Sequence, residues 1–100
     1  MGDRVPVIQR PAYSVSYEMT GRYHLGHVQV TKWSAPIARQ FRKDIDTAQS
    51  LLGADVFVVV PADRPNLPKF LRMHGWDEVG TVINQHGLPA PLFMRPPPHG

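Results

Sequence analysis

Residues 34–60 read SAPIARQFRKDIDTAQSLLGADVFVVV and contain two contrasting hydrophobic patterns. In the first part, apolar side chains recur at helical spacing, at Ile37, Phe41, Ile45, Ala48 and Leu52. Ser34 suits the N-cap of such a helix, and Gly53 suits its C-terminal end. Residues 56–60 form a short β-branched run, which is typical of a strand buried on both faces. The pattern therefore predicts a helix of roughly 18 residues, followed by a central strand.

The residues before this helix predict an antiparallel hairpin over residues 13–32. Residues 13–20 alternate between apolar and polar side chains, and Gly21 marks a turn. In the second strand the apolar face changes at Gly26, which predicts a β-bulge at that position. A strand, a helix and a second strand form a right-handed crossover when they lie in one sheet. We therefore expect the second hairpin strand and residues 56–60 to run parallel.

The residues after the central strand predict a short helix and a second pair of strands. Asn66 suits the N-cap of a helix over residues 67–74, which Gly75 ends. Strands are predicted at 76–83 and 92–95, on either side of a turn at residues 84–87. The order is then β-β-α-β-α-β-β. This order predicts an α/β (α+β) fold with a mixed sheet and two helices.

Length and proline content predict one domain with extended ends. A chain of 100 residues has room for one modest core. Several of its 11 prolines lie near the ends, so residues 1–12 are expected to form an extended arm and residues 96–100 a proline-rich tail. The single domain is predicted at residues 13–95.

Composition excludes several classes of site. The absence of cysteine excludes disulfides and zinc–thiolate centres. His24 and His27 have no third ligand at metal spacing, so no metal is expected. No apolar run is long enough for a membrane span, so no membrane is expected. A small chain without cysteine and without a signal-peptide stretch in residues 1–10 is expected to be cytoplasmic. The net charge of +3 is too small to favour nucleic acid as a partner.

The segment Asn66–Trp76 reads NLPKFLRMHGW and is similar to a motif of the GNAT N-acetyltransferase superfamily, N-x3-F-Y-x3-G-F. It follows a strand with a break at Gly26, a long helix and a buried strand, in the order seen in the C-terminal half of that fold. The resemblance covers about residues 13–96. Within the superfamily, Trp33-Ser34 and Phe41-Arg42-Lys43 resemble short acetyltransferase-like proteins of bacteriophages.

The resemblance implies a minimal or truncated GNAT-like fold that binds acetyl-CoA or another acyl-CoA. In the family, the pantetheine arm of the cofactor lies between two splayed parallel strands. The implied cofactor-binding residues are His27, Val28, Val30, Ser34, Arg39 and Asn66. The oxyanion donor would come from the backbone near His27 and Val28, and the acid for the leaving group has no assignment.

Three departures from the family pattern leave two interpretations of the function open. Residues 31–36 have no glycine where the family has a glycine-rich phosphate loop, and Pro36 removes one N–H donor. Leu71 stands where the family usually has a tyrosine acid. The family's first strand and first two helices have no counterpart. One interpretation is an acyl-CoA-dependent N-acyltransferase with a degenerate cofactor loop. The alternative is a non-catalytic assembly or protein-binding module of phage or prophage origin. That module would self-associate or bind a protein, in the cytoplasm or the virion.

Several side chains carry an ordinary structural interpretation beside the functional one. Asn66 suits a helix cap as well as a cofactor ligand. Glu18 suits an exposed strand position as well as a general base. The basic residues on the two helices suit a solvated surface as well as a phosphate patch. Trp33 and Trp76 are expected to anchor the core.

Overall fold

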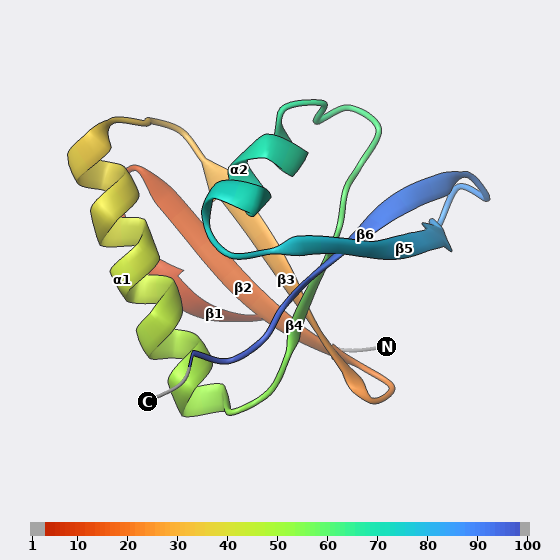
Figure 1. The fold of residues 1–100 in the computed structure, drawn as a ribbon, viewed down its shortest axis with the longest axis horizontal. Coiled ribbons are helices and arrows are strands. Elements are labelled where there is room, and N and C mark those ends of the chain that lie inside the picture. Colours follow the sequence, from red (N-terminus) through yellow and green to blue (C-terminus); the bar gives the residue numbers. More distant parts are fainter. Residues whose placement is uncertain (1–3, 99–100) are drawn as a thin grey trace.

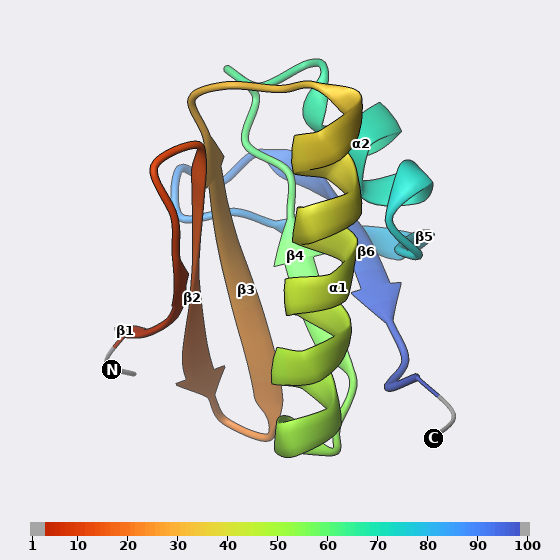
Figure 2. The same ribbon diagram turned by 90° about the vertical axis from the view of Figure 1, so that its left-hand side faces the viewer.

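The computed structural model describes residues 4–98 as one six-stranded mixed sheet with two helices (Figure 1). The elements are β1 (Arg4–Gln9), β2 (Tyr13–Thr20), β3 (Tyr23–Val30), α1 (Ala35–Leu52), β4 (Val56–Val59), α2 (Leu67–Met73), β5 (Asp77–Ile83) and β6 (Pro89–Arg95). The strand order in the sheet is β1-β2-β3-β4-β6-β5. Both helices lie on the same face of the sheet (Figure 2). The predicted fold class is therefore confirmed.

The hairpin and the parallel crossover are confirmed, whereas the bulge at Gly26 is wrong. β2 and β3 pair antiparallel without a break in register, and β3 runs parallel to β4. The apolar face changes along β3 because both faces of the sheet carry apolar side chains. Gly26 and Val28 face the helices, whereas Tyr23 faces the other side. There its ring packs edge-on against Phe57, with centroids 5.3 Å apart.

β1 is a strand that the sequence pattern does not predict. Residues 4–9 fall in the expected arm, but they pair antiparallel with β2 and cover its edge. The register shifts between Pro6 and Ile8, and this irregularity hides the alternation of side chains along the strand. Ile8 reaches the core and is 7% exposed. Residues 1–3 of the arm and 99–100 of the tail lie outside the described residues.

α1 begins and ends at the predicted residues. The Ser34 hydroxyl accepts a hydrogen bond from the backbone N–H of Ile37 at 3.4 Å. Gly53 adopts the left-handed conformation, with φ of 68°, and donates its N–H to the carbonyl of Gln49. Phe41 and Ile45 are fully buried, and each stabilises the fold by about 1.5–3 kcal/mol through burial. This burial fixes α1 against the sheet, where the Phe41 ring packs edge-on against Tyr13 of β2.

Aromatic side chains fill the space where the two helices meet. The Phe41 ring of α1 lies 5.0 Å from the Phe70 ring of α2. Trp76 is buried as predicted, and its indole N–H donates to the carbonyl of Val56 at 3.2 Å. Trp33 is instead 40% exposed and packs at the edge of this cluster. The prediction of a core anchor is therefore right for Trp76 and only partly right for Trp33.

A buried arginine ties α1 to the last strand. The Arg95 guanidinium donates to the Gln49 side-chain oxygen at 2.7 Å and to the carbonyl of His74 at 2.8 Å, and it pairs with Asp46. The Gln49 amide donates in return to the carbonyl of Arg95 at 2.6 Å. These contacts join α1, the end of α2 and β6, so they hold the helix layer in place on the sheet.

β6 begins at Pro89, three residues before the predicted start. Pro89 and Pro91 suggest a break, since proline cannot donate to a strand ladder. The carbonyl of Pro91 accepts from the N–H of Val60 at 3.0 Å, so the backbone of Pro91 faces β4. The β4 ladder ends one position earlier, at Leu92. The N–H that Pro91 lacks would therefore lie beyond the paired residues of β4, so its absence costs the ladder no hydrogen bond.

Candidate functional site

β3 and β4 part soon after they meet. Their parallel pairing covers only His24 with Val56 and Leu25 with Phe57. β3 nevertheless continues to Val30, and Figure 1 shows the two ribbons diverging toward the end of the molecule that carries α2. We use the name slot for the stretch along which residues 27–30 of β3 and the end of β4 no longer pair. Along it, the β4-facing backbone groups of β3 have no strand partner.

Gly26 lies at the point where the slot begins. A Cβ atom at this position would lie 3.1 Å from Cγ1 of Val56, closer than ordinary packing allows. Val56 is fully buried and has little freedom to move. Glycine therefore lets the two strands approach closely here, immediately before they separate.

Arg64 enters the slot from the loop between β4 and α2. Its Nη1 donates to the carbonyl of Val28 at 2.6 Å. Successive backbone groups of a strand point in opposite directions, so the N–H of Val28 also faces β4, whereas the N–H of His27 faces β2. Sequence reasoning missed Arg64. The available signal was a cationic residue placed in the loop directly after the central strand.

A pocket of about 320 Å³ lies at the open end of the slot. Its lining comes from the end of β3, the loop after β4 and the start of α2, namely Val30, Asp63, Arg64, Pro65, Asn66, Leu67 and Phe70. The walls are mostly apolar, and the polar groups are those of Asp63, Arg64 and Asn66. An extended ligand in the slot would emerge into this pocket.

The structure brings together only part of the predicted cofactor site. Val30 and Asn66 line the same pocket, and Val28 borders the slot beside it. Ser34 and Arg39 are exposed and are not among the lining residues. Asn66 takes the N-cap position of α2, as predicted, but its side chain makes no capping hydrogen bond to the helix. Its backbone is helical, with φ of −89° and ψ of −8°, whereas capping residues are usually extended.

The His27 side chain lies on the face of the sheet opposite the helices. Its Nε2 lies 2.8 Å from Oε1 of Glu18, and Arg4 approaches the same carboxylate at 3.8 Å. Both Glu18 and His27 are half-buried. Glu18 is therefore not a free strand carboxylate, because one of its oxygens contacts the side chains of His27 and Arg4.

His74 is a buried histidine beside the aromatic cluster. Neither ring nitrogen has a hydrogen-bond partner in the part of the chain that the structure describes, and the residue is 4% exposed. Burial, reinforced by the positive charges of Arg42 and Arg95, lowers the pKa of His74 to about 4. The imidazole is therefore neutral at neutral pH and packs as an aromatic ring, 4.9 Å from Phe41.

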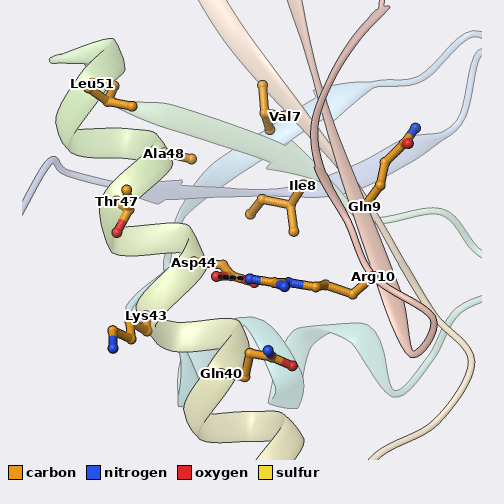
Figure 3. Close-up of a pocket in the computed structure, with 10 residues that line it drawn as sticks. All are labelled: Val7, Ile8, Gln9, Arg10, Gln40, Lys43, Asp44, Thr47, Ala48 and Leu51. Atoms are coloured by element: carbon orange, nitrogen blue, oxygen red, sulfur yellow. Dashed lines mark hydrogen bonds and ion pairs between the residues drawn. The ribbon is translucent and has the colours of Figure 1, made fainter.

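Another pocket, of about 540 Å³, lies between β1 and α1, away from the slot (Figure 3). Arg10 crosses it and pairs with Asp44 at 2.9 Å. The hydroxyl of Tyr13 donates to the same carboxylate at 2.7 Å. The hydrogen bond from Arg10 holds the pKa of Asp44 below its usual value, and burial raises the pKa of Tyr13 to about 12. These paired groups form a clamp between β1 and α1, and none of the predicted site residues lines the pocket.

Within residues 4–98, no three His, Asp or Glu side chains gather as metal ligands would. Neither α1 nor α2 combines the length and apolar character needed to cross a bilayer.

Comparison with known proteins supports the fold. No protein-family model and no curated protein sequence matches the chain. A solved structure, provisionally named a phosphinothricin N-acetyltransferase, is similar with a TM-score of 0.60 and 16% sequence identity. The similarity covers 88% of this chain and 65% of that protein, so the chain spans about two thirds of the length of its structural neighbour. At this identity the likeness establishes a GNAT-like fold and leaves the activity to be argued from the site.

Proposed function

We propose that the chain binds an acyl-CoA in the slot and acts as a minimal N-acyltransferase. The observation that carries this proposal is the early end of the β3–β4 ladder after two residue pairs. Buried backbone N–H and C=O groups need partners, and β4 supplies none to the second half of β3. A linear ligand with its own amide groups would complete the ladder.

The pantetheine arm of coenzyme A has the chemistry for this position. It is an extended chain with two amides, so it can exchange hydrogen bonds with a strand edge as another strand would. Val28 and Val30 present the edge, and the pocket at Asn66 receives the part of the arm beyond it. The residues of the slot therefore fit the arm.

The diphosphate of coenzyme A fits the residues at the start of α1 less well than the arm fits the slot. Residues 31–36 have no glycine, and the Ser34 hydroxyl already caps α1. Lys32 and Arg39 are exposed cations on either side of this cap. They supply countercharge without the backbone cradle that holds a phosphate tightly. We therefore expect affinity to come mainly from the arm.

In the proposed reaction, the nitrogen of an acceptor amine attacks the thioester carbonyl carbon. The amide bond forms as the carbon–sulfur bond breaks, and the proton lost by the nitrogen ends on the released thiol. The N–H of Val28 faces the slot and is the proposed donor to the oxyanion. Leu71 is fully buried and has no proton to give, so the thiolate would take its proton from the amine or from water.

Isothermal titration calorimetry with acetyl-CoA tests the proposal. We expect binding in the high micromolar range, and nearly the same affinity for S-acetyl-pantetheine, which lacks the diphosphate. Absence of heat with either ligand at high micromolar concentration contradicts the proposal.

A non-catalytic assembly module is the second candidate, and the sheet edges favour it. All but one residue of β5 are exposed, including Val79 and Ile83 at the free edge. Exposed apolar edges tend to be paired or covered. Under this proposal two copies associate through β5, or β5 receives a strand of a protein partner.

Phage or prophage origin, and a location in the cytoplasm or virion, belong to the same proposal. Light scattering that finds only monomers, together with no captured partner, contradicts it.

A further inference from the structure

The loop between β4 and α2 places a cationic side chain in the slot. We propose that Arg64 is an internal occupant of the slot, so that a ligand bound along β3 has to displace it. Arg64 would then set the affinity of the site. The identity of the ligand as a coenzyme A rests on the proposed function, whereas the occupancy of the slot by Arg64 does not.

The hydrogen bond of Arg64 replaces a missing ladder bond. Its Nη1 lies 2.6 Å from the carbonyl of Val28, in a partly buried contact. That carbonyl faces β4 at a position beyond the last β3–β4 pair, Leu25 with Phe57. An amide N–H of a pantetheine arm would donate to the same oxygen. The ligand and Arg64 therefore compete for one acceptor.

Two hydrogen bonds hold the backbone around Arg64, whereas its guanidinium has a single hydrogen bond within residues 4–98, to the carbonyl of Val28. The Arg64 N–H donates to the carbonyl of Pro61 at 3.2 Å, and the Arg64 carbonyl accepts from Leu67 at 3.2 Å. Pro65 stiffens the loop between these two bonds. Among residues 4–98, no carboxylate lies within salt-bridge distance of Arg64. Departure of the side chain would therefore break one hydrogen bond and no ion pair among these residues, while the two backbone bonds of the loop remain.

The pocket at the end of the slot has room for the displaced guanidinium. The pocket at the end of the slot already includes Arg64 and has about 320 Å³ of space beside Asn66 and Phe70. The side chain can therefore rotate toward solvent without moving α2. Arg64 is half-buried, so part of it already meets water.

Calorimetric titration with coenzyme A, which lacks a transferable acyl group, tests the inference on the intact chain. We expect Arg64→Ala and Arg64→Gln to bind at least tenfold more tightly than the wild type. Arg22→Ala removes the same charge from the exposed β2–β3 turn and should leave the affinity unchanged. Equal or weaker binding by both Arg64 variants overturns the inference, since an arginine that holds the ligand would lose affinity on removal.

Amide hydrogen exchange without ligand separates this inference from the proposed function. If Arg64 covers the slot, its removal should let water reach the β4-facing N–H groups of Val28 and Val30 and speed their exchange at least fivefold, with β2 unchanged. Unchanged exchange at these amides overturns the inference. Faster exchange with no coenzyme A binding by any variant supports the occupancy and removes coenzyme A as the ligand.

Discussion

At the scale of single residues, Gly26 decides how closely β3 and β4 approach. The sequence pattern singled out this glycine for a bulge, but its actual role is to leave room for Val56. Hydrophobicity along one strand cannot distinguish a change of register from a sheet that is apolar on both faces. Gly26 therefore matters to the sheet because of a close contact between strands, and not because of a bulge.

Gly26→Ala should destabilise the fold by about 1–2 kcal/mol, because the added methyl group meets a fully buried side chain at 3.1 Å. Urea denaturation followed by circular dichroism measures this. Gly80→Ala is the matched control, since it also lies in a strand and has no atom within 4 Å of its added Cβ. Equal stability of the two variants would show that the strands at Gly26 are not tightly packed.

His74 should make the stability depend on pH. In the unfolded chain the imidazole takes up a proton near pH 6.5, whereas in the fold its pKa is about 4. Between these values the unfolded state binds more protons, so the free energy of unfolding falls as the pH drops from 6.5 to 4. The full effect, for a shift from 6.5 to about 4, amounts to about 3 kcal/mol.

His74→Phe removes this effect and also removes two buried nitrogens that lack partners. Urea denaturation at pH 7 and pH 4.5 should therefore show a smaller loss of stability for the variant than for the wild type. Asp44, whose pKa is lowered, acts only below its ordinary value of 3.8 and does not interfere in this range. Parallel pH profiles of the two proteins would mean that another group causes the loss.

At the scale of elements, α1 is held to the sheet by apolar packing and by the Arg95 network. Gln49→Leu removes an acceptor from the buried guanidinium and a donor from the carbonyls of Ala54 and Arg95. A buried charge that loses a partner is costly, so we expect a loss of about 2–4 kcal/mol in thermal or urea unfolding.

Gln40→Leu is the matched control for this change. Gln40 lies on the exposed side of the same helix and should change the stability by less than about 0.5 kcal/mol. If the two variants unfold alike, the Arg95 network contributes little to the position of α1.

The sequence predicts most elements and misses those that depend on distant partners. α1 follows from local spacing and caps, and β4 follows from a short apolar run. β1 contains a proline and a shift in register, and only its pairing with β2 makes it a strand. Asn66 flanks a helix in the expected place, yet its side chain does not cap it. Local patterns therefore specify elements better than the contacts of single polar side chains.

At the scale of the whole molecule, the site depends on how three elements converge. The parallel arrangement of β3 and β4 follows from the crossover rule and is correctly predicted. The filling of the slot does not follow, because Arg64 lies 36 residues from Val28 in sequence and has no motif around it. The predicted cofactor residues divide accordingly. Val30 and Asn66 meet at one pocket, whereas His27 points its side chain to the opposite face.

The most direct measurement is an NMR titration of the ¹⁵N-labelled chain with coenzyme A. The proposed site predicts chemical-shift changes at residues 27–36 and 63–70, with little change along β1 and the outer face of α1. Shifts centred on the Arg10–Asp44 pocket, or none at millimolar ligand, would contradict a ligand slot between β3 and β4.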